Sequence, residues 1–179
     1  FALYMEYPGA MSVFCDGRTY RDTVAMERFA RRNARRGSTE ARQPNDGRFT
    51  VVRDLAEWMS RHAHEVEKFC MFFDTAEQAQ AALPRFRALA GAEVVQGSPD
   101  NIELTAQGVD KGTALLALAD LLHIPREATV AVGDSENDRA MLEKAGIAAV
   151  MANGMPHIQA LADLVSTNGC DHDGVAELF

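Results

Sequence analysis

The chain has 179 residues, of which 47% are hydrophobic and 25% charged, enough apolar material for one or two modest cores. Its formal net charge of −8 argues against a general nucleic-acid or membrane-surface role, because either role needs a basic face. Three scattered cysteines without CxxC spacing, Cys15, Cys70 and Cys170, indicate neither a disulfide framework nor a zinc site, so we expect a reducing, cytoplasmic location.

The first part of the chain predicts a strand, a hairpin and a helix. Residues 1–7 are apolar with one acid and read as a strand, and Asp16-Gly17 between two apolar runs is a strong hairpin signal. Residues 23–36 follow a helical pattern that stacks five arginines on one broad face: Arg28, Arg31, Arg32, Arg35 and Arg36. This face is either an anion-binding or partner surface or a solvated helix face, and we favour the second because charge stripes usually face solvent.

The middle of the chain predicts a small α/β layer domain. Residues 37–47 are polar and rich in turn formers, hence a loop. The pattern then predicts a helix at 54–62, a buried strand at 66–73, a helix from Asp74-Thr75 that Pro84 kinks or ends, and two strands at 92–96 and 101–106. Strands and helices that alternate over residues 10–106 indicate one layered domain, with 107–110 as its return linker.

The last part of the chain alternates regularly between helix and strand. The predicted helices are 111–122, 136–145 and 156–161, and the predicted strands are 129–132, 148–151 and 164–167. This alternation is typical of a doubly wound parallel sheet, which binds its ligands at the carboxyl ends of the strands.

One stretch of this part, VAVGDSENDRAML from Val130 to Leu142, carries candidate chemistry. Asp134 follows the strand, and Ser135 can cap the helix that carries Asp138, so we expect both carboxylates to face one crevice. Close carboxylates favour a hard cation, and Mg²⁺ beside a phosphate is a common arrangement. Asn137 offers an amide donor to such an anion. The plainer alternative is that Asp134 and Ser135 are only capping residues.

The order of these motifs resembles the haloacid dehalogenase (HAD) superfamily, specifically its Cof-type hydrolases. Upstream, Lys111-Gly112-Thr113-Ala114-Leu115 matches the family's KGxAL segment, whose lysine steadies the phosphate and the nucleophile, and Gly133 to Asp138 matches its GDxxND magnesium loop. Downstream, Asn153, the Ala162-Asp163 pair and Asp173-Gly174-Val175 follow in the family's order. The resemblance is close over about the last eighty residues and looser before them.

The resemblance implies an α/β fold with a HAD-like doubly wound parallel-sheet core, incomplete in this chain, and an inserted α/β cap domain. Residues 1–8 would be the end of the core or a linker, 9–106 the cap domain and 107–179 the C-terminal part of the core. Caps of this family cover the active site, exclude water and select the substrate. The family's NGA opening of the cap is matched only loosely by Pro8-Gly9-Ala10.

The family's nucleophile motif, DxDx[TV] at the end of a strand, has no convincing match in the chain. Asp74 and Asp16 each lack the second acid, because Ala76 and Arg18 stand in its place, and Asp171-His172-Asp173 follows turn residues instead of a strand. We therefore expect the nucleophile segment to precede Phe1 in the full gene product or to be a separate chain. The 179 residues alone are then expected to be unstable or inactive.

The resemblance implies a Mg²⁺-dependent phosphatase that hydrolyses small phosphorylated metabolites, such as sugar or cofactor phosphates, through an aspartyl-phosphate. Lys111 and Asp134 would be catalytic, Lys111 and Asn137 would bind substrate, and Asp134 and Asp138 would hold the metal, Asp138 through water or by holding a neighbouring group. We expect no nucleic-acid or membrane partner.

Four alternatives stay open. The chain can be a non-catalytic HAD-like module that binds a phosphorylated ligand or a partner, and a phosphotransferase or mutase would use the same site. Lys111 can be a solvated lysine at a helix start, although a cation is poorly placed there, which favours function. Asn153 is as compatible with a turn as with a functional role. His157 has no partner that sequence spacing identifies.

Overall fold

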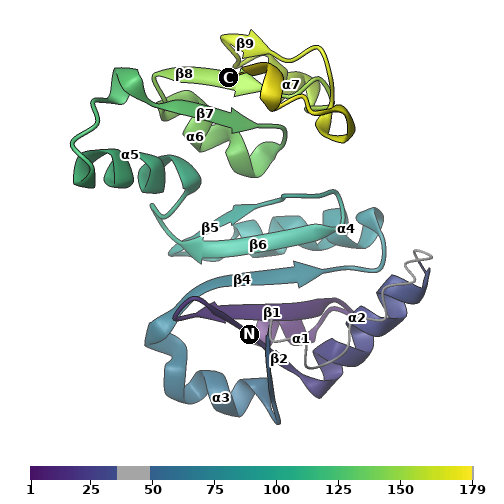
Figure 1. The fold of residues 1–179 in the computed structure, drawn as a ribbon. Helices are drawn as coiled ribbons and strands as arrows, with labels where there is room; N and C mark the ends of the chain where they lie inside the picture. Colours follow the sequence, from purple (N-terminus) through teal and green to yellow (C-terminus); the bar gives the residue numbers. More distant parts are fainter. Residues whose placement is uncertain (36–48, 179) are drawn as a thin grey trace. The chain divides into compact units, whose positions relative to one another are not determined.

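The computed structural model describes residues 1–35 and 49–178, which fall into two compact units (Figure 1). The first unit is Phe1–Val94 with Ser98–Gln107, and the second is Val95–Gly97 with Gly108–Phe179. The predicted loop at 37–47 lies outside the described residues. The fold is mixed α/β, as predicted.

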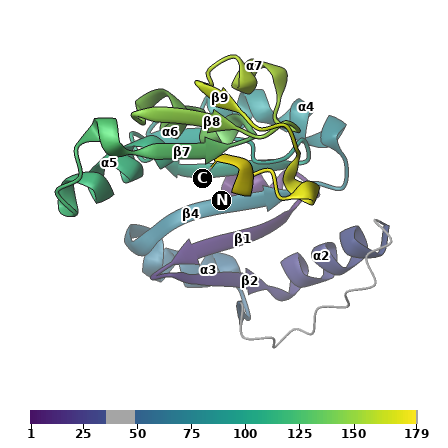
Figure 2. The same ribbon diagram turned by 45° about the horizontal axis from the view of Figure 1, so that its top comes forward.

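The first unit is built on a six-stranded sheet with the order β3-β2-β1-β4-β6-β5. Its strands are β1 (Ala10–Cys15), β2 (Arg18–Asp22), β3 (Thr50–Val52), β4 (Val66–Phe72), β5 (Ala92–Val95) and β6 (Asn101–Ala106). β4 pairs antiparallel with both β1 and β6, and Figure 2 shows β1 and β4 side by side. The predicted hairpin is confirmed: Asp16 and Gly17 take φ of 50° and 65° between β1 and β2, as a two-residue hairpin turn requires.

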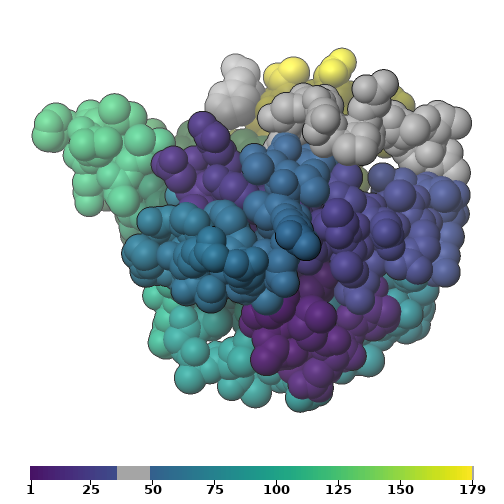
Figure 3. Space-filling view, turned by 90° about the horizontal axis from the view of Figure 1, so that it is seen from below, coloured from purple at the N-terminus to yellow at the C-terminus, as the bar shows by residue number. Residues whose placement is uncertain are grey.

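Helices cover both faces of this sheet. They are α1 (Ala2–Met5), α2 (Thr23–Arg35), α3 (Leu55–His62) with the 3₁₀ turn η1 (Ala63–Glu65), and α4 (Ala76–Arg87). Residues of α1, α3 and α4 share one core with Met71, whereas Phe29 of α2 packs edge-on against the neighbouring residue Phe72. Because neighbouring strand residues point to opposite faces, α2 lies on the face away from the other three helices. The outer surface of α3, in blue, is seen in Figure 3.

The strand predicted for residues 1–7 is wrong, because the segment forms α1 and a turn. Leu3, Tyr4 and Tyr7 all pack against the same core, and Tyr4 is only 3% exposed. A strand would point Leu3 and Tyr4 to opposite faces, whereas a helical turn brings residues three and four apart together. The apolar character of this segment was recognised from the sequence, but strand periodicity was assigned where the structure has a helical turn.

The solvated arginine face predicted for α2 is also wrong in part. Arg28 donates to the backbone carbonyl of Gly9 at 2.6 Å, and Arg32 Nη2 lies 2.5 Å from Asp100 Oδ2. The side chains of Arg32 and Asp100 are only 11% and 5% exposed. Arg31 is exposed, as predicted, and Arg36 lies outside the described residues. The inward arginines therefore fasten α2 to its own unit and bind internal partners, not an external anion.

The second unit contains a three-stranded parallel sheet with the order β7-β8-β9 (Figures 1 and 2). Its strands are β7 (Val130–Gly133), β8 (Ile147–Val150) and β9 (Leu164–Val165), and its helices are α5 (Lys111–Leu121), α6 (Arg139–Lys144) and α7 (Pro156–Gln159). Four 3₁₀ turns complete it: η2 (Arg126–Ala128), η3 (Glu136–Asp138), η4 (Cys170–His172) and η5 (Ala176–Leu178). The predicted alternation is confirmed, except that the helix predicted from residue 136 begins as the turn η3.

One face of this sheet packs against α6 and α7, and the opposite face is exposed at the first residues of β7 and β8. Ala131, Ala148 and Val150 share a buried cluster with Leu142 of α6 and Ile158 of α7. The register partners Val130 and Ile147 point away from that cluster and are 40% and 38% exposed. Within residues 1–35 and 49–178, no strand pairs with the outer edge of β7. No helix in the described ranges has the length and apolar character that a membrane crossing needs.

Candidate functional site

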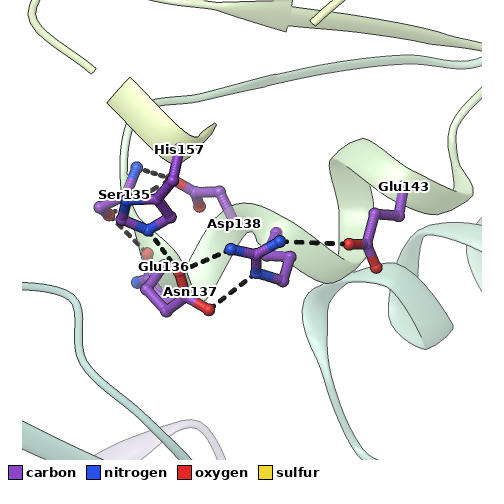
Figure 4. Close-up of polar contacts among 7 residues, drawn as sticks. Ser135, Glu136, Asn137, Asp138, Glu143 and His157 are labelled. Carbon is purple, nitrogen blue, oxygen red and sulfur yellow. Dashed lines mark hydrogen bonds and ion pairs between the residues drawn. The ribbon is translucent and has the colours of Figure 1, made fainter. Parts of the chain in front are cut away.

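The candidate site is the tight turn that joins β7 to η3. Gly133 ends the strand, and a Cβ atom at this position would lie 2.5 Å from the Cβ of Asp138, so only glycine fits here without a shift. The backbone N–H groups of Asp134 and Ser135 donate to Asp138 Oδ2 at 3.0 and 3.2 Å. Asp138 therefore folds back beneath the turn and fixes its backbone. Figure 4 shows Asp138 with Ser135 beside it.

The other carboxylate oxygen of Asp138 accepts from Lys111. Lys111 Nζ lies 2.5 Å from Asp138 Oδ1, and Asp138 is only 5% exposed, whereas half of the Lys111 side chain is open to solvent. Burial acts to raise the pKa of Asp138, but hydrogen bonds from Lys111 and from the two backbone N–H groups outweigh it and hold this pKa below its usual value. Asp138 is therefore an ionised, fully hydrogen-bonded group that holds one side of an exposed lysine.

The first turn of α5 places Lys111. Asp110 is the N-cap, and its Oδ1 accepts from the backbone N–H of Thr113 at 2.7 Å. Gly112 lies so close to the carbonyl of Ala140 in α6 that an added Cβ atom would collide with it. The glycine of the KGxAL segment thus lets α5 approach α6 closely enough for Lys111 to reach Asp138.

Asp134 occupies a more open position than Asp138. It is partly exposed, and Asn153 Nδ2 lies 3.4 Å from its Oδ2. Asn153 Oδ1 in turn accepts from the backbone N–H of Cys170 at 2.8 Å. The backbone N–H of Met155 donates to the Asp134 carbonyl at 2.9 Å. Asn153 therefore links the Asp134 carboxylate to the C-terminal segment, and its amide and carbonyl groups are both used.

Asn137 presents an amide group beside these residues. Its Oδ1 accepts from the Ser135 hydroxyl at 2.7 Å, which fixes the orientation of the side chain. Its Nδ2 has no hydrogen-bond partner among residues 1–35 and 49–178, and the residue is partly exposed. Asn137 is thus held with its donor group available.

A further ion-pair network in this unit was not predicted. The Glu136 carboxylate lies 2.8 Å from Arg139 Nε and 2.8 Å from His157 Nε2, and Figure 4 shows Glu136 and His157 facing each other. The hydrogen bond from Arg139, together with that from His157, lowers the pKa of Glu136 against a smaller effect of burial. Glu136 and His157 are 21 residues apart, so no local pattern in the sequence could identify the pair.

Asp134 is the more open of the two carboxylates that we expected to hold a divalent cation. Within the described ranges no three His, Cys, Asp or Glu side chains gather into a metal site. Asp134 is accessible, whereas both oxygens of Asp138 already accept hydrogen bonds, so the two carboxylates do not face one open crevice as expected. Mg²⁺ is commonly held by one or two carboxylates together with phosphate oxygens and water, and Asp134 fits one such ligand.

The three acids that imitate the nucleophile motif lie in other settings. Asp16 is in the β1–β2 turn, Asp74 accepts from Arg35 at 2.5 Å, and Asp173 has a left-handed backbone after η4. None of these three follows a strand of the parallel sheet. The structure thus brings together Lys111 and Asp138 and places Asp134 and Asn137 on the adjoining turn.

Comparisons with known proteins identify the family of this chain. A model of the haloacid dehalogenase-like hydrolase family matches residues 11–179. The phosphatase YwpJ of Bacillus subtilis is 39% identical over 103 residues, which are 58% of this chain and 36% of that protein. The 5-amino-6-(5-phospho-D-ribitylamino)uracil phosphatase YcsE of the same organism is 32% identical over 114 residues, 64% of this chain and 45% of that protein.

A solved structure shows the same fold. A haloacid dehalogenase-like hydrolase from B. subtilis superimposes with a TM-score of 0.76 at 27% identity, covering 99% of this chain and 66% of that one. The chain thus spans less than half the length of the two curated relatives that it matches. Since the family model covers nearly the whole chain, and motifs and fold agree with it, the protein belongs to the haloacid dehalogenase-like hydrolases, as its resemblance to their Cof-type members predicted.

Proposed function

We propose that this chain forms the substrate-selecting and phosphate-stabilising parts of a Mg²⁺-dependent phosphatase that acts on small phosphorylated metabolites in the cytoplasm. Residues 9–106 act as the cap domain and 107–179 as the C-terminal part of the catalytic core, with 1–8 as the connection between core and cap. The relatives named as phosphatases support the reaction class. The substrate is a phosphomonoester, such as a sugar or cofactor phosphate.

The observation that carries this proposal is the contact between Lys111 and Asp138. A buried carboxylate holds one side of the ammonium, and half of the lysine side chain remains open to solvent. A lysine placed in this way is oriented by the carboxylate and still accessible, so it can stabilise negative charge on phosphoryl oxygens. A lysine that was merely exposed to solvent at the start of a helix would need no buried carboxylate as its partner.

The other residues of the turn have complementary roles. Asn137 donates its free amide N–H to a phosphoryl oxygen, while Ser135 keeps that amide in place. Asp134 holds Mg²⁺, and Asn153 orients its carboxylate. A Mg²⁺ ion held there would supply Lewis-acid stabilisation of the charge on the phosphoryl group. Asp138 holds Lys111 and the turn, and does not bind the ion directly.

The nucleophile belongs to a segment outside these 179 residues. Its carboxylate would attack phosphorus as the bond to the alcohol oxygen breaks and that oxygen takes a proton from the second aspartate of the same motif. That aspartate would then accept a proton from the water that hydrolyses the aspartyl-phosphate, which releases inorganic phosphate and the free carboxylate. Among residues 1–35 and 49–178 no strand pairs with the outer edge of β7, which is compatible with a further strand at this position. We therefore expect no hydrolysis by the 179 residues alone.

The test is hydrolysis of p-nitrophenyl phosphate by the chain alone and by the chain extended with the segment encoded upstream. We expect Mg²⁺-dependent hydrolysis by the extended protein, loss of it with EDTA, and a fall of about 10²–10³-fold in kcat for Lys111→Met. Asp120→Asn on the exposed side of α5 is the matched control. An extended protein that binds phosphate esters but does not hydrolyse them would support the non-catalytic module instead.

A further inference from the structure

Two ion pairs cross from the first turn of α5 to the segment of η3 and α6, and their charges run in opposite directions. In one pair the cation is Lys111 on α5 and the acid is Asp138 at the end of η3. In the other pair the acid is Asp110, the N-cap of α5, and the cation is Lys144, the last residue of α6. Asp110 and Lys111 are neighbours, so both pairs act on the same turn of helix.

The second pair is made of well-fixed groups. Lys144 Nζ lies 3.2 and 3.1 Å from the two carboxylate oxygens of Asp110, and both side chains are about two-thirds buried at 34% and 26% exposed. The Asp110 carboxylate also accepts from the backbone N–H of Thr113 at 2.7 Å. Arg126 Nε donates to the carbonyl of Lys144 at 2.6 Å, which fixes the backbone beneath the lysine.

Gly112, next to both pairs in the sequence, lies in close contact with α6. A Cβ atom at Gly112 would meet the carbonyl of Ala140 and, at 2.7 Å, the Cδ atom of Lys144. The aliphatic part of Lys144 therefore packs directly over Gly112, beside the backbone that carries Lys111. A displacement of Lys144 or Asp110 would change the position of this helical turn.

The geometry points to Asp110 and Lys144 as positioning residues for Lys111. The inference rests on the proposed role of Lys111 in stabilising the phosphoryl group, and neither residue is expected to touch the substrate. The Asp110–Lys144 pair holds the first turn of α5 against α6, so that the Lys111 ammonium stays against Asp138 before any substrate arrives. Preorganisation of this kind lowers the reorganisation that the reaction itself would need.

The composition of the chain allows a direct test without substrate. The protein has only three lysines, Lys68, Lys111 and Lys144. Lys68 lies in the first unit, 3.2 Å from Glu103, and serves as an internal reference. We would treat the folded protein, with its upstream segment included, with a limiting amount of an N-hydroxysuccinimide ester of acetate. The acetylation of Lys111 relative to Lys68 would be measured by peptide mass spectrometry.

We expect Lys144→Met to raise the Lys111-to-Lys68 ratio about two- to fivefold, because Lys111 leaves Asp138 more often. Asp110→Asn keeps an N-cap oxygen but loses the charge, and it should raise the ratio similarly. The double variant should raise the Lys111-to-Lys68 ratio no further than either single variant does, since both substitutions remove the same ion pair. Lys144→Arg should restore the wild-type ratio, and Glu143→Gln on the same helix should leave it unchanged.

An unchanged ratio in both single variants would overturn the inference, as would equal increases at Lys111 and Lys68, which indicate general loss of structure. The outcome does not depend on phosphatase activity, so it separates this inference from the proposed function. In an extended protein that is active, Lys144→Met should lower kcat several-fold with KM nearly unchanged, whereas a merely structural defect would lower only the amount of folded enzyme.

Discussion

Lys111 and Asp138 are 27 residues apart in the sequence, and their side chains meet at 2.5 Å between Nζ and Oδ1. The other oxygen of Asp138 accepts from the backbone of the turn at Asp134 and Ser135. One buried carboxylate thus joins α5 to the turn that carries Asp134 and Asn137. Asp138 is therefore the group that connects Lys111 to the rest of the candidate site.

Substitution of Asp138 by Asn is therefore expected to destabilise the protein. The amide keeps the volume but loses the charge, and its NH₂ group faces either Lys111 or the backbone donors of the turn, neither of which can accept from it. We expect a loss of about 2 kcal/mol in the free energy of unfolding, measured with urea. Asp120→Asn, on the exposed side of α5, should change it by less than about 0.5 kcal/mol.

The effect of Asp138→Asn should also depend on pH. The folded protein holds the pKa of Asp138 below its ordinary value, so the ionised carboxylate stabilises the fold above the unfolded pKa of about 4. This stabilisation is lost as the pH falls through the unfolded and then the folded pKa. The stability difference between wild type and variant should thus be constant from about pH 8 to pH 5 and shrink below about pH 4. A difference that grows on acidification would contradict this.

Gly112→Ala tests the close approach of α5 and α6. The added methyl group would collide with the backbone of Ala140, which cannot move aside as a flexible side chain can. Although alanine favours helices, overpacking at such a contact costs about 1–3 kcal/mol of unfolding free energy. Ala117→Ser on the exposed side of α5 is the control, with an expected change below about 0.5 kcal/mol. A stabilised Gly112→Ala variant would show that the helices separate freely.

The sequence predicted the helices and strands of the second unit well, because each has a strong local signal. The apolar run ended by Gly133 predicted β7, and the pattern from Lys111 predicted a helix at 111–122, where the structure has α5. The candidate site residues were chosen from the order and the spacing of the motifs along the chain. Motif order does not show how deeply a side chain is buried, so the enclosed position of Asp138 was not expected.

Contacts between distant segments were the features that could not be predicted. Arg32 has the same place in a charge stripe as the exposed Arg31, and only its buried partner Asp100, 68 residues away, distinguishes them. The pairing of Glu136 with His157 likewise joins residues that are far apart in the sequence. The strand prediction for residues 1–7 was wrong for a different reason. A short apolar run is compatible with both helical and strand periodicity until the surface that it packs against is known.

The difference between Arg32 and Arg31 gives a matched pair of variants. Arg32 is the buried partner of Asp100 and also donates to the backbone carbonyl of Phe73. Arg32→Met should lower the unfolding free energy by about 3 kcal/mol, because Asp100 loses this cation in a buried setting. Arg31→Met removes the same charge from the exposed side of α2 and should cost less than about 0.5 kcal/mol. Equal effects of the two variants would place Arg32 in solvent.

The three cysteines should react with alkylating reagents at very different rates. Burial, together with the nearby Glu103 carboxylate, raises the pKa of Cys70 to about 12, and burial with nearby acids also raises the pKa of Cys15. At pH 8 only about one Cys70 in 10⁴ would then be the reactive thiolate, whereas Cys170 is exposed. Iodoacetamide at pH 8 should label Cys170 first in the folded protein and all three residues in 6 M guanidinium chloride. Rapid labelling of Cys70 without denaturant would mean that the β1–β4–β6 region opens readily, and the burial that defines the first unit would have to be revised.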